Sequence, residues 1–278
     1  MFTVMRRHLD RLLNIFLAIT RQLQDCQKTV EKLNSISASS ERTYEELDRI
    51  RTVLRTSQQR TFPRKMREFG LDLIVREGVF PPEDFQSWRW FSENFPPFTG
   101  KTILEIGCGF GLPGLLLAKT GALSLLACDI NPKAVANTLE NAARNGIKNV
   151  GVIESDIFSN IPPGRKFDII FWNHPWNFAP ADFELDDLER GAFDPSYGLL
   201  ERFLSEGREF LTERGKILLG FGTNARDDLL ERFGAVNDLK SVIVKSGTYP
   251  NVNSTYRLFS IRRSATAYGF RPSMSVDT

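Results

Sequence analysis

The fold of this chain is decided by the stretch Glu105-Ile106-Gly107-Cys108-Gly109-Phe110-Gly111, which ends an apolar run starting at residue 102 and opens a helix-like segment over 112–120. Glycines at alternate positions let the backbone turn tightly and let a ligand approach where a Cβ atom would clash. The stretch therefore predicts a strand, a ligand-binding turn and a helix in direct succession.

Short apolar runs alternate with helical stretches on the carboxyl side of this turn. We expect strands over 102–107, 123–129, 150–156, 167–173 and 216–222, and helices over 112–120, 132–145 and 195–212. Buried strands joined by crossover helices predict an α/β fold with a doubly wound, mostly parallel sheet. Two further runs, 241–246 and 255–262, predict an antiparallel hairpin at its edge, which makes seven strands.

The amino-terminal part has a different pattern. Apolar residues over 9–33 recur at alternating steps of three and four, which is the seam of a coiled coil, and a second helix follows from Ser40. We expect a helical hairpin over 1–60 that packs on the catalytic domain as a lid or dimerises through residues 9–33. A linker and cap segment over 61–97, a catalytic domain over 98–263 and a flexible tail over 264–278 complete the prediction.

Composition narrows the classes of protein. The chain of 278 residues has no apolar run long enough for a transmembrane helix, so we expect no membrane association. Its three scattered cysteines form no disulfide framework, which indicates a cytoplasmic location. Residues 1–67 hold 14 Lys and Arg against 7 Asp and Glu, whereas the rest holds 22 against 27. An acidic catalytic part makes nucleic acid an unlikely partner.

Asp129 indicates what the glycine turn binds. It ends the second expected strand, 22 positions after Gly107, where a carboxylate can accept hydrogen bonds from both hydroxyls of a ribose. The glycine spacing differs from that of a pyrophosphate-binding turn, and the carboxylate of Glu105 stands beside it. A ligand with a cationic amino group fits better, which favours S-adenosyl-L-methionine (SAM) over a dinucleotide. No metal-binding motif is found in the sequence, so we expect no metal ion.

The third expected strand adds contacts for an adenine ring. Asp156 can accept a hydrogen bond from the adenine amino group, and Ile130 and Ile157 can enclose the ring. The alternative interpretation is that Asp156 only caps the following loop.

The fourth expected strand ends in Asn173-His174-Pro175-Trp176. Asn173 offers an amide oxygen, Pro175 stiffens the backbone, and Trp176 offers a π-face to a sulfonium or a planar substrate. A scaffold without chemistry has little use for this tetrapeptide, so we expect catalytic residues here, with Asn173 also lying beside the cofactor.

These pieces together resemble class I SAM-dependent methyltransferases with a Rossmann-like fold. Over about half of the chain the resemblance is to the group of release-factor glutamine and ribosomal RNA guanine N-methyltransferases, whose Asn-Pro-Pro-Tyr motif stands where this chain has Asn173–Trp176. The resemblance also covers 78–81, 129–132, 193–195 and 198–199. It implies that Asn173 and the carbonyl of His174 accept hydrogen bonds from the target nitrogen and aim its lone pair at the methyl group.

His174 departs from that pattern, because the group has proline at this position. The imidazole adds a group that titrates near neutral pH, so it could be a base, or it could pack outward. In either case, the resemblance implies that the backbone carbonyl of His174 accepts a hydrogen bond from the target nitrogen.

Three functions follow. The first is SAM-dependent methyl transfer to an amide or amine nitrogen of a small molecule or a protein side chain. The second is cyclisation of SAM itself to azetidine-2-carboxylate with release of methylthioadenosine, under a Phe-rich lid. The third is a SAM-binding or coiled-coil scaffold without catalysis, which the motif at 173–176 disfavours.

Overall fold

The computed structural model describes residues 44–249 and 254–264. The expected coiled-coil seam over 9–33 and almost all of the expected tail lie outside these residues. The chain divides into two compact units, Met1–Arg49 and Ile50–Thr278, and the architecture below is that of the second. No helix in the described part of the chain is long and apolar enough to cross a membrane.

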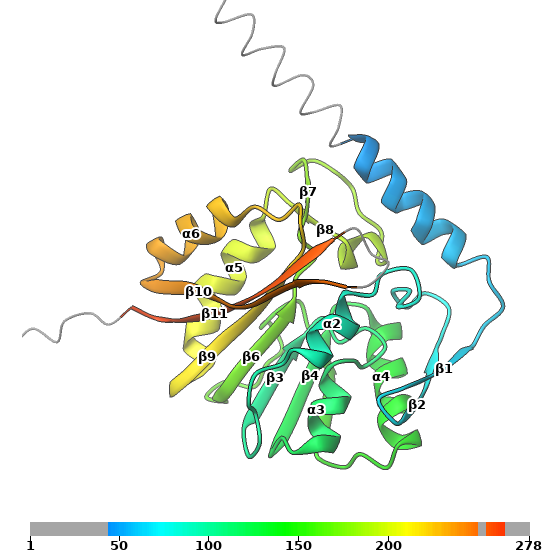
Figure 1. Ribbon diagram of the computed structural model, residues 1–278, viewed down its shortest axis with the longest axis horizontal. Coiled ribbons are helices and arrows are strands. Elements are labelled where there is room, and N and C mark those ends of the chain that lie inside the picture. Colours follow the sequence, from blue (N-terminus) through cyan, green and yellow to red (C-terminus); the bar gives the residue numbers. More distant parts are fainter. Residues whose placement is uncertain (1–43, 250–253, 265–278) are drawn as a thin grey trace, which may run out of the picture. The chain divides into compact units, whose positions relative to one another are not determined.

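A sheet of seven strands forms the centre of the second unit, in the order β10-β11-β9-β6-β3-β4-β5 (Figure 1). Neighbouring strands from β9 to β5 are parallel, and β11 joins β9 and β10 antiparallel. This confirms the predicted mostly parallel sheet and its terminal hairpin. The bounds are β3 Thr102–Ile106, β4 Ser124–Asp129, β5 Val150–Glu154, β6 Phe167–Asn173, β9 Leu211–Phe221, β10 Leu239–Thr248 and β11 Thr255–Arg263.

Alternate residues of the strands enter two hydrophobic clusters on opposite faces of the sheet. One cluster includes residues of α2 (Ser87–Glu93), α3 (Gly114–Thr120) and α4 (Pro132–Arg144). The other includes residues of α5 (Gly198–Gly207) and α6 (Asp227–Val236). The sheet is therefore wound on both faces, as doubly wound α/β folds require.

Several boundaries differ from the sequence prediction. The helix expected from residue 195 begins at Gly198, because Phe193–Pro195 forms a short strand, β8, that pairs in parallel with β7 (Asn177–Ala179). Strand β9 begins at Leu211, five residues earlier than expected. The glycine turn also lengthens the first connection, so that α3 begins at Gly114 and not at 112.

The segment predicted as a linker contains an antiparallel hairpin of β1 (Arg64–Glu68) and β2 (Leu71–Val75). Its two-residue turn, Phe69-Gly70, has positive φ at both positions, as tight hairpin turns require. The burial pattern of β2 shows that it packs inward, so this part of the segment is not a simple linker.

Asparagines spaced four apart, two on α4 and one at its carboxyl-terminal cap, take the place of a third strand beside β2. The side chain of Asn137 accepts from Arg76 N, that of Asn141 accepts from Ile74 N and donates to Ile74 O, and that of Asn145 bonds both N and O of Asp72. Asn141 also donates to Phe110 O in the glycine turn. This asparagine ladder satisfies the free edge of β2 and joins the hairpin to the site.

We predict that Asn141→Ala lowers the free energy of unfolding by about 2–4 kcal/mol, because it leaves the buried Ile74 N–H and Phe110 carbonyl without partners. Urea unfolding followed by circular dichroism measures the change. Asn145→Ala is the matched control, since its bonds to Asp72 are exposed and water replaces them at a cost below about 1 kcal/mol. Equal losses for the two variants would contradict the role of burial.

Candidate active site

Four segments far apart in the sequence meet at one edge of the sheet. They follow β3, β4, β5 and β6, which are parallel neighbours, so their carboxyl ends lie together (Figure 1). The segments that hold the predicted site residues therefore lie at one edge of the sheet. Among the described residues, no group of three or more His, Cys, Asp or Glu side chains could hold a metal ion.

The glycine turn is held by β4. Gly107, Gly109 and Gly111 all have positive φ, so only glycine fits all three positions without strain. Gly109 N donates to Asp129 Oδ2 at 2.9 Å, and Cys108 N donates to the carbonyl of Cys128. A Cβ atom on Gly109 would meet nothing within 4 Å, so this part of the turn is open to a ligand.

Asp129 is fixed by backbone donors. Its other oxygen, Oδ1, accepts from Asn131 N at 2.9 Å. Burial raises the pKa of Asp129, its backbone hydrogen bonds lower it, and the negative charge of Asp187 raises it. The two carboxylate oxygens are thus held in a fixed orientation and keep lone pairs that can accept hydrogen bonds from ribose hydroxyls.

Glu105 lies against the first turn of α3 with 2% of its surface exposed. Its Oε1 accepts from Gly114 N at 3.0 Å, and a Cβ atom at Gly114 would fall 2.0 Å from Oε2. Oε2 is buried and has no hydrogen-bond partner among the described residues. Burial raises the pKa of Glu105 well above its ordinary value, and the negative charge of Asp129 adds to the rise.

The expected adenine contacts are only partly available. Ile130 is 38% exposed beside Asp129, whereas Ile157 is 4% exposed and belongs to the core cluster that includes α5. Asp156 forms an ion pair with Arg202 of α5, with 2.8 Å between Nη1 and Oδ2. No local sequence pattern indicates this pairing, because the two residues are 46 positions apart.

Asn173 is oriented by a residue outside the four segments. Its Nδ2 donates to Ser87 Oγ of α2 at 3.0 Å, while its Oδ1 is buried without a partner among the described residues. The carbonyl of His174 accepts from Trp176 N at 2.9 Å. The Trp176 ring lies over Gly222, where a Cβ atom would come within 2.4 Å of it.

The imidazole of His174 is completely buried, which contradicts the outward packing considered above. Its Nε2 lies 2.8 Å from Asp194 Oδ2, and its ring packs against Trp172 at 4.7 Å between centroids. The other ring nitrogen, Nδ1, is buried without a partner among the described residues. The structure thus replaces an outward side chain with a buried one whose contact with Asp194 holds the loop.

The residues that sequence reasoning missed all hold the loop at 173–176 from outside. The carboxylate of Asp194 accepts from Leu199 N and Leu200 N in addition to contacting His174. The hydroxyl of Tyr197 donates to the carbonyl of Trp176 and accepts from Arg226 N. Only Asp194 had a signal in the sequence, because it lies in the segment 193–195 on which the resemblance rests.

We predict that Glu105→Gln stabilises the protein without ligand at about pH 8. The pKa of Glu105 is higher in the folded protein than in the unfolded chain, so ionisation of this carboxyl group lowers the free energy of unfolding at pH values above its pKa in the unfolded chain. The wild type therefore loses stability as the pH rises toward that raised pKa, and the variant loses less. Urea unfolding at about pH 5 and about pH 8 measures the difference.

Asp168→Asn is the control of opposite sign. Hydrogen bonds from Thr102 and Thr212 leave the pKa of Asp168 below its ordinary value, although burial acts the other way. The ionised carboxylate of Asp168 therefore stabilises the folded protein at pH values above the pKa of this group in the unfolded chain. Asp168→Asn should be less stable than the wild type at both pH values. A Glu105→Gln variant that is also less stable at the higher pH would contradict the prediction.

Comparison with known proteins identifies the family to which the chain belongs. The family model of the methyltransferase small domain matches residues 71–242. A putative protein N5-glutamine methyltransferase of Methanocaldococcus jannaschii is 36% identical over 151 residues, 53% of this chain and 74% of that protein. The release factor glutamine methyltransferase of Fusobacterium nucleatum is 30% identical, and the ribosomal RNA small subunit methyltransferase C of Vibrio vulnificus 29%; each aligns with 54% of this chain. The chain spans only 42% and 39% of those two relatives.

Solved structures share the fold. A 16S rRNA N2 methyltransferase of T. thermophilus, solved with AdoMet and guanosine, gives a TM-score of 0.52 at 19% identity, covering 73% of this chain and 50% of its own. A putative methyltransferase, SMU.776, solved with SAH, gives 0.53 at 16% identity, covering 73% of this chain and 57% of its own. With the family match over more than half of its length, this chain belongs to the methyltransferase small domain family and is a SAM-dependent methyltransferase.

Proposed function

We propose that the chain transfers the methyl group of SAM to the amide nitrogen of a protein glutamine side chain. The observation that carries this proposal is Asn173 Oδ1, a buried acceptor without a partner among the described residues, at the edge of the sheet where the cofactor residues meet. Buried polar atoms are nearly always paired, so an unpaired acceptor in an oriented amide fits a ligand N–H.

The residues present fit SAM. Glu105 Oε2 is the second buried acceptor without a partner, and it can satisfy a cationic amino group directly or through a water molecule. Asp129 is fixed for ribose hydroxyls by Gly109 and Asn131, and Ile130 offers an exposed apolar face to the adenine. When bound, SAM supplies an electrophilic methyl carbon on its sulfonium.

Asn173 and His174 then act on the acceptor nitrogen. An amide nitrogen has two N–H groups, and the Asn173 Oδ1 and the second lone pair of the His174 carbonyl can accept one each. Held in this way, the nitrogen presents its face to the methyl carbon, so the acceleration comes from position and orientation. The N–C bond would form as the bond between sulfur and the methyl carbon breaks, which leaves S-adenosylhomocysteine, and the N–H proton that the nitrogen loses would pass to solvent water.

Charge near the site supports a neutral acceptor over a polyanionic one. The segment 182–189 holds five Asp and Glu residues, and Asp187 lies near enough to Asp129 to raise its pKa. Nucleic acid phosphates would be repelled there. Relatives named for glutamine and for ribosomal RNA both occur, so RNA is one outcome of the test below. The cyclisation of SAM has no support among these relatives, all of which are named methyltransferases.

The test incubates the enzyme with SAM in four arms: alone, with N-acetyl-L-glutamine N-methylamide, with a peptide that contains an internal glutamine, and with ribosomal RNA. Mass spectrometry detects S-adenosylhomocysteine and the methylated product. Methylation of the glutamine amide supports the proposal. Methylation of RNA alone, or methylthioadenosine formed from SAM alone, would overturn it.

Two variants should separate cofactor binding from acceptor positioning. We predict that Asp129→Ala raises the Kd of SAM at least about tenfold, because it removes charge-assisted hydrogen bonds. We predict that Asn173→Ala lowers kcat about 100-fold and changes the Kd of SAM less than about threefold, because it removes only the positioning of the acceptor. Isothermal calorimetry gives Kd, and S-adenosylhomocysteine formation gives kcat; a loss of SAM binding in Asn173→Ala would contradict the assigned roles.

A further inference from the structure

We infer that Ser87 is a positioning residue, whose hydroxyl holds the Asn173 carboxamide with its oxygen toward the acceptor nitrogen. The inference rests on the proposed role of Asn173 and adds a residue from outside the four cofactor segments. The contact that carries it is the 3.0 Å hydrogen bond from Asn173 Nδ2 to Ser87 Oγ, between residues 86 positions apart.

A carboxamide has two ends of similar shape and opposite hydrogen-bonding character. A serine hydroxyl can bond either end, because it both donates and accepts. Only one orientation suits the reaction, however. With Nδ2 on Ser87, Oδ1 remains for the N–H of the acceptor, whereas the flipped amide would set its own N–H groups against that N–H. Ser87 must therefore act as the acceptor for Nδ2.

The helix that carries Ser87 is firmly packed. Ser87 is the first residue of α2 and is 7% exposed, so water does not compete freely for its hydroxyl. Phe91 of the same helix packs directly over Gly220 of β9, where a Cβ atom would come within 2.5 Å of its ring. Trp88 contacts Phe110 of the glycine turn edge to face, at 5.1 Å between ring centroids.

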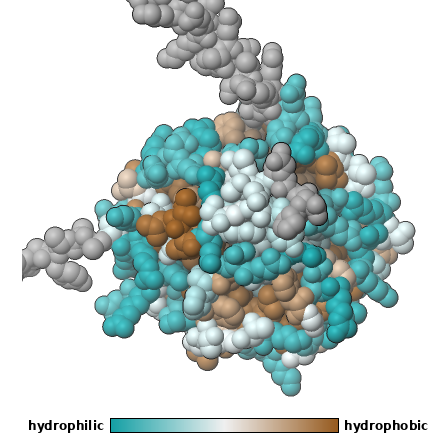
Figure 2. Space-filling model, viewed as in Figure 1, coloured by the Kyte–Doolittle hydropathy of each residue, from teal (hydrophilic) through white to brown (hydrophobic). Residues whose placement is uncertain are grey.

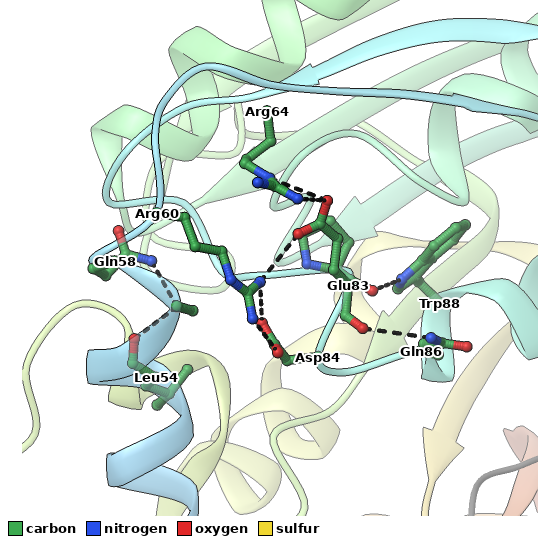
Figure 3. A network of polar contacts seen from close by, with 10 residues as sticks. Leu54, Gln58, Arg60, Arg64, Glu83, Asp84, Gln86 and Trp88 are labelled. Atoms are coloured by element: carbon green, nitrogen blue, oxygen red, sulfur yellow. Dashed lines mark hydrogen bonds and ion pairs between the residues drawn. The ribbon is translucent and has the colours of Figure 1, made fainter.

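The segment that leads into α2 is fixed by a polar network (Figure 3). Arg60 bonds both oxygens of Asp84, at 2.7 and 2.6 Å, and also bonds Glu83. Arg64 bonds the other oxygen of Glu83, and Trp88 Nε1 donates to the carbonyl of Pro82 at 2.9 Å. These contacts set the position of Ser87 before any acceptor arrives, which is what a positioning residue requires.

The test uses the full-length protein and two readouts. Nuclear magnetic resonance of asparagine-labelled protein follows hydrogen exchange of the Asn173 Nδ2 protons, with Asn173→Ala providing the assignment. Turnover is measured with N-acetyl-L-glutamine N-methylamide, and the Kd of SAM by calorimetry. The variants are Ser87→Ala and Ser87→Thr, which retains the hydroxyl. Ser92→Ala is the control, because the Ser92 hydroxyl on the same helix bonds only the Trp88 carbonyl.

In Ser87→Ala we expect faster exchange of the Asn173 Nδ2 protons and a fall in kcat of about tenfold, the size of one lost buried hydrogen bond. We expect the Kd of SAM to stay unchanged. Ser87→Thr should keep slow exchange and most of the turnover, and Ser92→Ala should resemble the wild type. Thermal unfolding shows which variants keep the fold, and a misfolded Ser87→Thr leaves Ser87→Ala to decide.

Unchanged exchange in a folded Ser87→Ala variant would overturn the inference. A Ser87→Ala variant with wild-type turnover would do the same if Asn173→Ala is inactive, and it would leave the proposed function standing. If the wild type does not methylate this amide or Asn173→Ala keeps full turnover, the proposed function fails, while the exchange measurement still decides whether Ser87 holds the amide.

Discussion

The buried carboxylate of Asp194 is the interaction on which the geometry of the active site depends. It contacts the imidazole of His174 and accepts from Leu199 N and Leu200 N, so it joins the end of β6 to β8 and the start of α5. A fully buried carboxylate is stable only when such donors surround it. The loop that presents Asn173 is therefore joined to α5 through Asp194, and moving it would leave buried polar atoms of Asp194 without partners.

On the cofactor side of the site, the buried carboxylates are not fully satisfied by protein donors. Glu105 and Asp129 are carboxylates whose pKa values are raised by burial, and Glu105 has an oxygen that no described residue satisfies. Such groups lower the stability of the protein without ligand, and strained or unsatisfied groups of this kind gather at functional sites. The buried carboxylates thus differ in their surroundings: Asp194 is satisfied by protein donors, and we propose that Glu105 and Asp129 bind the cofactor.

Residues before the central sheet complete the site. The hairpin of β1 and β2 is joined to α4 by the asparagine ladder, and the segment that leads into α2 is held by Arg60 and Arg64. Through these contacts Ser87 reaches Asn173. Figure 2 shows hydrophobic areas at the left and the lower centre of this face, separated by hydrophilic surface.

The sequence by itself determined the parallel sheet, its edge hairpin and the four segments of the site, because strand periodicity, glycine spacing and acidic strand ends are local patterns. It could not determine the pairing of Asp156 with Arg202, of His174 with Asp194 or of Asn173 with Ser87, since each joins residues at least 20 positions apart. Only tertiary packing decides such contacts, because burial selects which polar groups must find one another. That is why the sequence alone left the His174 side chain as a base or an outward group, whereas the structure shows it buried against Asp194.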